Sequence, residues 1–207
     1  MSGGRSGWKG GTFGPLMNFL GHLYLSGNDP LVITGNFMAD AIKGGDLSRF
    51  PADLQRGIRL HRAIDHYTDQ HPLARAGRER ARAHAGRYAP VVMDLFYDHL
   101  LAAHWNTLHP EPLDQFTARM YTVLKAHATW MEGRPARMLP HLMAEDWLGA
   151  YAHREGLAGA LRGMARRAPE GHAMVGAEEV LWQHYDAYRA EFIGFLTDIE
   201  RDTRSLR

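Results

Sequence analysis

The chain has 207 residues, with 24 Lys or Arg, 23 Asp or Glu and no Cys. This length suits one well-packed domain, and the near balance of charge excludes bulk attraction to nucleic acid or to an anionic membrane surface. The lack of cysteine excludes disulfides, thiolate catalysis and thiolate metal sites. It also fits a reducing compartment, so we expect a cytoplasmic protein.

The first 16 residues are rich in glycine and contain no apolar segment of the kind found in secretory signals. We therefore expect residues 1–16 to form a flexible extension. Met17 is followed at once by the apolar segment NFLGHLYL and is the expected native first residue. Residues 17–207 are then the folded domain, and none of its apolar runs approaches the roughly 20 residues needed to cross a bilayer.

Helical periodicity recurs along this domain, whereas alternating strand patterns are short. Breaks such as GNDP at 27–30, Gly44-Gly45 and His71-Pro72 separate the periodic segments. The pattern predicts an all-α fold, a single helical domain of about eight helices, in which the very apolar segment 90–107 is central. The expected helical segments are 17–26, 31–42, 51–71, 73–84, 90–107, 113–131, 135–150, 153–166 and 176–203.

The segment 51–71 places His61, Asp65 and Asp69 four residues apart. Side chains with this spacing form one column on a helix face. Two carboxylates in one column repel each other unless a positive group lies beside them. A metal ion is one such group, and the neighbouring Arg59 and Arg62 are another, so the segment alone leaves both interpretations open.

The apolar segment 90–107 repeats the pattern, because Asp94 and Asp98 are four apart and His99 follows. A buried pair of carboxylates needs compensation by cations or a metal. His22 and Asp40 add further candidates from two other apolar segments. Asp or His side chains contributed by separate helices indicate a mixed oxygen and imidazole metal site.

Each of these residues also has a structural interpretation. His22 can be a hydrogen-bonded helix histidine, and Asp40 can be an exposed residue near Gly44, although a carboxylate at a helix C-terminus opposes the helix dipole. Asp65 and Asp69 can pair with arginines. A site rich in carboxylates and imidazoles suits Mn²⁺, Mg²⁺ or Fe²⁺, with Zn²⁺ as an alternative.

Such a site is suited to phosphate ester hydrolysis, because the ion binds phosphoryl oxygens and lowers the pKa of a bound water. Nearby arginines can offset charge that develops on the phosphate. The sequence contains no G-x-x-x-x-G-K-[ST] or G-x-G-x-x-G phosphate loop and no G-x-S-x-G elbow, so a serine nucleophile has no support.

Four motifs give the chain a resemblance to a known family. They are Met17-Asn-Phe-Leu-x-His22, Gly35-Asn36-x-x-Ala-Asp40, His61-Arg-x-Ile-Asp65-x-x-Thr68-Asp69, and Asp94-x-x-x-Asp98-His99-x-Leu101-x-x-His104-Trp105. In this order they resemble the acyl carrier protein phosphodiesterases, as do the weaker features Gly163-Met164-Ala and His184-Tyr185-Asp186. The resemblance runs from about Met17 to about residue 200.

The resemblance implies a helical fold remotely related to the HD-type metal-dependent phosphohydrolases. It also implies Mn²⁺-dependent hydrolysis of the phosphodiester joining 4′-phosphopantetheine to a serine of acyl carrier protein. Because the doublet here reads Asp98-His99 rather than His-Asp, ligands are not transferred from HD proteins one by one. The implied metal ligands are His22, Asp40, His61, Asp65, Asp69, Asp98 and His99, and the implied catalytic residues are Asp40, His61, Asp98 and His99. Asp94 and Asn36 are second choices.

Arginines concentrate between Arg75 and Arg87, directly after the proposed site helix. Acyl carrier proteins are strongly acidic, so this basic patch is either a docking surface, which steers association, or an ordinary solvated face. The expected substrate-binding arginines are Arg62, Arg75, Arg78 and Arg82.

Two other functions fit the same residues. One is a related phosphohydrolase that acts on a nucleotide or another small phosphodiester. The other is a helical module that binds acyl carrier protein without catalysis and uses its carboxylates only for salt bridges.

Overall fold

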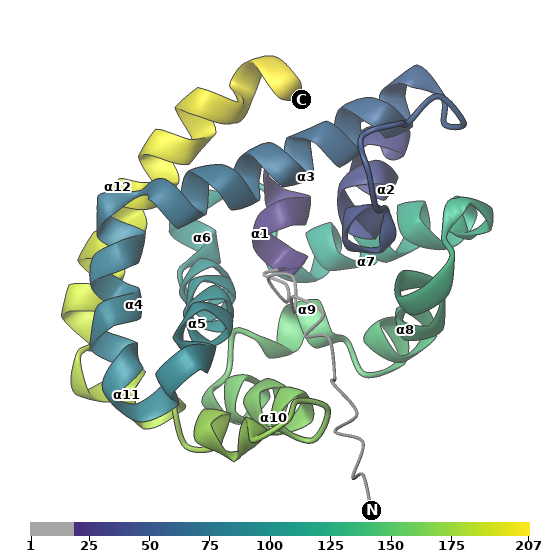
Figure 1. Cartoon of the computed structure of the whole chain (residues 1–207). Coiled ribbons are helices and arrows are strands. Elements are labelled where there is room, and N and C mark those ends of the chain that lie inside the picture. Colours follow the sequence, from purple (N-terminus) through teal and green to yellow (C-terminus); the bar gives the residue numbers. More distant parts are fainter. Residues whose placement is uncertain (1–18) are drawn as a thin grey trace, which may run out of the picture.

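The computed structural model describes residues 19–207, and these residues are helical with no strand among them (Figure 1). The expected extension 1–16 and the expected start at Met17 lie outside the described residues. The α-helices are α1 (Phe19–Tyr24), α2 (Pro30–Met38), α3 (Ala52–Gln70), α4 (Pro72–Ala85), α5 (Ala89–Ala103), α6 (Trp105–Leu108), α7 (Leu113–Ala126), α8 (Gly133–Ala144), α9 (Trp147–Ala150), α10 (Arg154–Ala165), α11 (Glu178–Gln183) and α12 (Tyr185–Thr203). One-turn 3₁₀ segments adjoin them, of which η1 (Ala39–Ala41) bears on the site.

The all-α prediction is confirmed, but several expected helices are divided. The chain leaves helical geometry at His104, at His127 and at His184. At Asp146 it enters the left-handed region with φ of 41°, and the Asp146 carboxylate accepts hydrogen bonds from Gly149 N and from the Tyr121 hydroxyl. Apolar periodicity continues across these points, so it gives no sign of the breaks.

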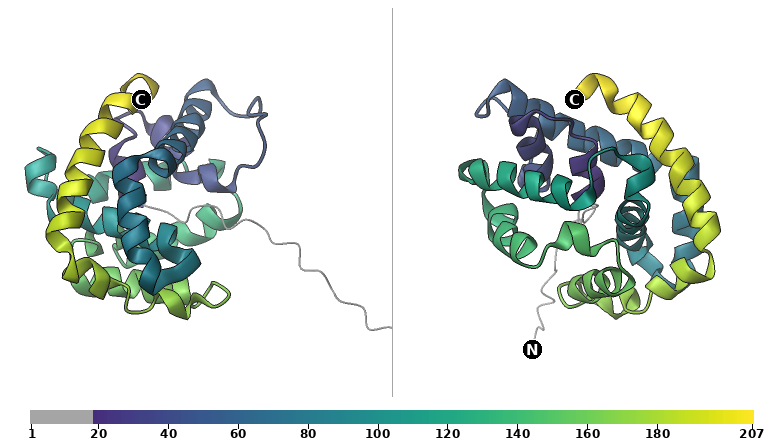
Figure 2. Two further views of the ribbon diagram at one scale, coloured as in Figure 1. Left: turned by 60° about the vertical axis from the view of Figure 1, so that its left-hand side comes forward. Right: turned by 180° about the vertical axis from the view of Figure 1, so that it is seen from behind.

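Helix α5 is the central element, as its composition predicts. Its side chains are buried on almost every face, and α1, α4, α10 and α12 pack against it. Helix α12 runs along the outside of α3 and α4, as the rotated views show (Figure 2). A helix that is apolar all round needs such covering on every side.

Helices α2 and α3 pack in backbone contact. A Cβ atom added at Gly35 would lie 2.3 Å from Leu54 O, and one added at Gly57 would lie 2.2 Å from Val32 O. Only glycine permits this approach. The contact brings Asn36 of α2 against His61 of α3. Gly35 and Gly57, which have no side chains, therefore determine how close these two residues lie.

Among residues 19–207, no helix is both long enough and apolar enough to span a membrane.

Candidate metal centre

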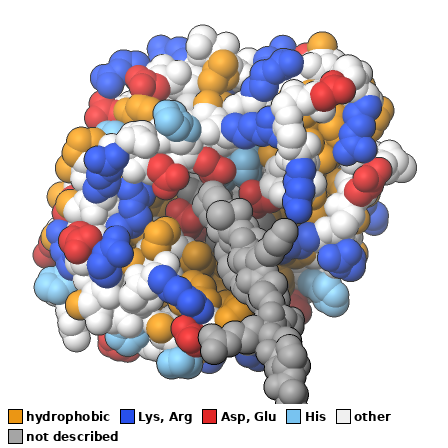
Figure 3. Space-filling view, viewed as in Figure 1, with side chains coloured by type: hydrophobic (Ala, Val, Ile, Leu, Met, Phe, Trp, Pro, Cys, Tyr) orange, Lys and Arg blue, Asp and Glu red, His pale blue; other side chains and the backbone are white. Residues whose placement is uncertain are grey.

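Four elements contribute side chains to one cluster beside α3. His22 comes from α1, Asn36 from α2 and Asp40 from η1, and α3 supplies His61 and, one turn later, Asp65. The two imidazole rings are buried and stacked, with centroids 4.2 Å apart and planes at 25°. Acidic side chains and a histidine gather near the middle of this face, with basic side chains on both sides (Figure 3).

Asn36 fixes the orientation of both rings. Its Nδ2 donates to His22 O at 3.0 Å and to Ser26 Oγ at 2.8 Å, which leaves Oδ1 as an acceptor on the opposite side. His22 Nδ1 lies 2.8 Å and His61 Nδ1 lies 3.1 Å from that Oδ1. Each Nδ1 therefore carries the proton and donates it to Asn36, and in a neutral ring the lone pair is on Nε2.

Both Nε2 atoms face carboxylates. Asp65 Oδ1 lies 3.2 Å from His22 Nε2, and Asp65 Oδ2 lies 3.2 Å from His61 Nε2. Asp40 Oδ1 also lies 3.2 Å from His61 Nε2. The ligand atoms of His22, His61 and Asp65 all lie within 4.8 Å of one another. The two carboxylate side chains are about one-quarter exposed, so the cluster opens to solvent on their side.

Without a metal ion, hydrogen bonds between the histidines and the carboxylates stabilise the cluster. Burial opposes a charge on His61, but hydrogen bonds with Asp40 and Asp65 outweigh it and raise the pKa of His61 to about 9. Burial, followed by the nearby charge of His61, lowers the pKa of His22. Burial also opposes ionisation of Asp65, yet its hydrogen bonds with both histidines hold the pKa of Asp65 well below the ordinary value.

The donor set fits a divalent metal ion. When both rings are neutral, two Nε2 lone pairs face carboxylate oxygens, and acceptors that face one another need a cation between them. Imidazoles that donate their other N–H to a fixed acceptor are the usual metal-binding arrangement. Two imidazoles with carboxylates suit Mn²⁺, Fe²⁺ or Zn²⁺.

Asp69 does not join this cluster. Although it lies one turn after Asp65 on α3, its side chain is 65% exposed, and its nearest cation is Arg78 at 3.9 Å. It lies at the last turn of the helix, where the arginines of α4 gather.

Asp98 is fully buried and lies outside the cluster. Its carboxylate accepts hydrogen bonds from Leu20 N at 3.2 Å and Gly21 N at 2.9 Å, at the start of α1. Burial raises the pKa of Asp98 well above its ordinary value, and these two hydrogen bonds partly oppose the shift. Asp98 therefore holds the helix that carries His22. Burial also raises the pKa of Asp94, and the charge of Asp65 adds to that effect.

His99 lies further away, between α5 and the C-terminal helices. Its Nδ1 donates to Tyr151 O at 2.8 Å, and the ring packs edge-on against Trp182 with centroids 5.1 Å apart. Burial lowers the pKa of His99. These contacts describe a neutral, structural histidine rather than one that faces the Asp65 cluster.

Three of the four predicted substrate arginines donate to backbone carbonyls. Arg78 donates to Thr68 O at 3.1 Å and Asp69 O at 2.7 Å, so it satisfies carbonyls at the end of α3. Arg75 also donates to Asp69 O, at 3.2 Å. Arg62 donates to two carbonyls of the loop after η1, and Arg82 pairs with Glu79.

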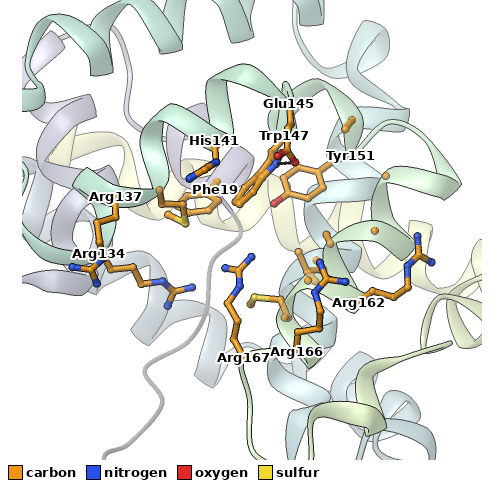
Figure 4. A pocket seen from close by; sticks show the side chains of 18 residues that line it. Phe19, Arg134, Arg137, His141, Glu145, Trp147, Tyr151, Arg162, Arg166 and Arg167 are labelled. Atoms are coloured by element: carbon orange, nitrogen blue, oxygen red, sulfur yellow. Dashed lines mark hydrogen bonds between the residues drawn. The ribbon is translucent and has the colours of Figure 1, made fainter.

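Sequence reasoning missed a second group of arginines. A cavity of about 930 Å³ between α8, α9 and α10 is lined by five of them, namely Arg134, Arg137, Arg162, Arg166 and Arg167 (Figure 4). We call this cavity the arginine pocket. Two of these arginines fall within residues 134–137 and three within residues 162–167. This local recurrence of arginine was the signal in the sequence that could have indicated the pocket.

Comparison with known proteins identifies the family. The family model described as "Acyl carrier protein phosphodiesterase" matches residues 17–199. The chain belongs to the acyl carrier protein phosphodiesterase family. A relative of that name from Salmonella dublin is 35% identical over 183 residues, which cover 86% of this chain and 93% of the relative.

Two further family members show the same relationship. The acyl carrier protein phosphodiesterase of Yersinia pestis is 32% identical over 91% of this chain and 98% of its own length. That of Escherichia coli O45:K1 is 36% identical over 86% of this chain and 93% of its own length. No solved structure matches the chain, so the remote relationship to HD-type phosphohydrolases stays a prediction.

Proposed function

We propose that this protein hydrolyses the phosphodiester between 4′-phosphopantetheine and a serine of holo-acyl carrier protein, and so releases apo-acyl carrier protein. Membership of the acyl carrier protein phosphodiesterase family supports the substrate. The observation that carries the proposal is the cluster in which two buried histidines direct their Nε2 atoms at Asp65. This arrangement is suited to a metal ion, and metal ions are suited to phosphate ester hydrolysis.

The ion that we propose is Mn²⁺, with Mg²⁺ or Fe²⁺ as alternatives. His22, His61 and Asp65 would hold it, and Asp40 adjoins them. When bound, such an ion stabilises negative charge on phosphoryl oxygens and lowers the pKa of a coordinated water. Two imidazole donors favour Mn²⁺ or Fe²⁺ over Mg²⁺, which prefers oxygen.

The remaining residues position and exchange protons. Asn36 keeps both Nδ1 atoms protonated and both Nε2 atoms turned inward. Asp40, at the open side, is the carboxylate that we assign to proton exchange with the substrate, because its hydrogen-bond partner His61 Nε2 would turn to the ion. Asp98 acts as a positioning residue for α1. Asp69 and His99 are not among the ligands that we propose.

The test is the intact mass of holo-acyl carrier protein after incubation with this protein. With Mn²⁺ present we expect loss of the phosphopantetheine mass, and with excess chelator we expect none. An unchanged mass with folded, Mn²⁺-loaded protein would reject the proposed reaction. If Mn²⁺ also failed to raise the Tm, a binding module without catalysis would be favoured, because an ion that binds only the native state stabilises it.

A further inference from the structure

Among residues 19–207, the lining of the arginine pocket includes five arginines and one acidic residue, Glu145. Within residues 19–207, none of its five arginines forms an ion pair or a side-chain hydrogen bond with another side chain or carbonyl. Glu145, the acidic residue in the lining, accepts a hydrogen bond from Trp147 Nε1 at 2.9 Å. Arg134 extends from α8 on one side, and Arg166 and Arg167, which follow α10, extend from the other side (Figure 4).

The arginine that lies deepest in the pocket is Arg134, whereas the other four are exposed. Arg134 is half-buried, and burial lowers the pKa of its guanidinium, as does the charge of Arg167. Like charges that share a partly desolvated site repel each other. Arginine pairs most strongly with phosphate and carboxylate, to which its planar group donates two parallel hydrogen bonds.

The wall of the pocket is apolar beneath the arginines. Phe19, Leu95, Met138, Trp147 and Tyr151 contribute to the lining, together with the glycine-rich face of α10. At about 930 Å³, the cavity has the size of sites that enclose an extended organic ligand. An apolar wall with a cationic rim fits a ligand that has a neutral arm and an anionic end.

The pocket adjoins the metal centre through Arg134. Helix α8 packs against η1, and the charge of Asp40 in η1 acts on the Arg134 guanidinium. Phe19, at the start of the helix that carries His22, lines the pocket itself. A ligand that occupies the pocket can therefore place its anionic group next to Asp40 and the two histidines.

We propose that the arginine pocket binds the phosphopantetheinylated end of the substrate, an inference that rests on the proposed function. The neutral pantetheine arm lies along the apolar wall, and Arg134 and Arg167 contact the phosphodiester. Arg137, Arg162 and Arg166, which are exposed like Arg167, face the acidic carrier protein around its modified serine. The predicted role of the α4 arginines remains the competing hypothesis, although Arg75 and Arg78 donate to carbonyls at the end of α3.

The first experiment measures ligand binding to the full-length, chelator-treated protein by isothermal titration. The probes are 4′-phosphopantetheine and pantetheine, which differ only in the phosphate. We expect 4′-phosphopantetheine to bind about 10-fold or more tightly than pantetheine, as one charge-assisted contact allows. The variant Arg134→Gln/Arg167→Gln should lose that difference, and Arg201→Gln/Arg204→Gln, which removes two arginines from the end of α12, should keep it.

The second experiment measures turnover of holo-acyl carrier protein in the presence of Mn²⁺. Arg134→Gln/Arg167→Gln should raise KM while the rise in Tm on adding Mn²⁺ stays as in the wild type, which separates a binding defect from a damaged metal centre. Arg134→Lys keeps the charge, so its KM should lie between that of the wild type and that of Arg134→Gln/Arg167→Gln. Circular dichroism spectra identify any variant that is misfolded, and Arg134→Lys then decides the question alone.

Two results would overturn the proposal. One is a binding result, either equal affinity of the wild type for 4′-phosphopantetheine and pantetheine or a preference of Arg134→Gln/Arg167→Gln for 4′-phosphopantetheine. The other is a raised KM in Arg75→Gln/Arg82→Gln with an unchanged KM in the pocket variant. Failure of the proposed function looks different, because 4′-phosphopantetheine would still bind through the pocket arginines while the mass of holo-acyl carrier protein stayed constant.

Discussion

Helices α3 and α5 both carry Asp and His close together, but their side chains have different partners. On α3, His61 and Asp65 meet each other, and their neighbours are His22 and Asp40. On α5, backbone groups occupy Asp98 and the adjacent histidine, because Asp98 accepts from two N–H groups and the histidine donates to a carbonyl. Both oxygens of Asp98 are therefore engaged by the backbone, whereas His99 uses only Nδ1, and its buried Nε2 has no hydrogen-bond partner among residues 19–207. His99 differs from His61 in position, because it packs against Trp182 rather than beside Asp65.

Solvent access separates the two regions further. The Asp65 side chain is 25% exposed, whereas Asp98 is fully buried. An ion and a phosphate can therefore reach α3 but not the equivalent carboxylate of α5. Residue type alone gives candidates on both helices, and hydrogen-bond partners and exposure distinguish Asp65 from Asp98.

Replacement of Asp65 should have the largest effect. Asp65→Asn removes the carboxylate that both Nε2 atoms face, so we expect turnover to fall by more than the roughly 10–100-fold that follows loss of a supporting residue. The matched control is Asp69→Asn, one turn later and exposed, which should stay near wild type. Equal losses in both variants, measured by the mass of holo-acyl carrier protein, would contradict the comparison.

Replacement of Asn36 should have the next largest effect. Asn36→Ala removes the acceptor that orients both rings, and the expected loss in Mn²⁺ affinity or in turnover is about 10–100-fold. Asn36→Asp keeps an acceptor for the two Nδ1 atoms but loses the donor to His22 O, so it should retain more Mn²⁺ affinity than Asn36→Ala. Titration with Mn²⁺ tests the order, and a reversed order would refute the assigned tautomers.

Replacement of Asp98 should affect stability more than catalysis. In Asp98→Asn one backbone N–H at the start of α1 loses its acceptor, so the free energy of unfolding should fall by about 1–3 kcal/mol. Urea unfolding measures this change. At a temperature where the variant is folded, its turnover should exceed that of Asp65→Asn. A loss of turnover as large as that of Asp65→Asn would give α5 a direct part in the reaction.

The pH dependence of the metal-free protein concerns stability alone and leaves turnover aside. Folding raises the pKa of His61 from 6.5 to about 9, so its contribution to stability is fully present below about pH 6.5 and is lost as the pH rises toward 9. The wild-type free energy of unfolding should therefore fall over this range relative to His61→Gln. Because Mn²⁺ needs the deprotonated ring, its stabilising effect should grow over the same range. Parallel pH curves for the two proteins would contradict this account.

Local pattern was sufficient for the fold class and for part of the site. The four-residue spacing joined His61 to Asp65, and the structure brings these two side chains together. Asn36 was named only through the family resemblance, as a second choice. The ligand set itself stays a prediction. Asp98 could not be told from Asp65 by sequence, because its partners in α1 are almost 80 positions away and come together only in the folded chain.

The arginine pocket escaped the sequence for a related reason. Arg134 lies on α8 and Arg167 follows α10, and each segment alone has the composition of an ordinary amphipathic helix. Only packing brings them together. Conversely, the arginines of α4 are dense in sequence, but Arg78 is held by the carbonyls at the end of α3. Local density of charge does not reveal which charges remain free.

The backbone contact of α2 with α3 at Gly35 and Gly57 also bears on ion selectivity. This contact fixes the separation of Asn36 on α2 from His61 on α3. His22 lies on α1 and is tied to the same pair through Asn36 Oδ1. We therefore expect the proposed metal site to discriminate by ionic radius and to reject large ions such as Ca²⁺, which need longer bonds and a flexible shell of oxygens. Gly57→Ala would relax that discrimination without altering a single ligand.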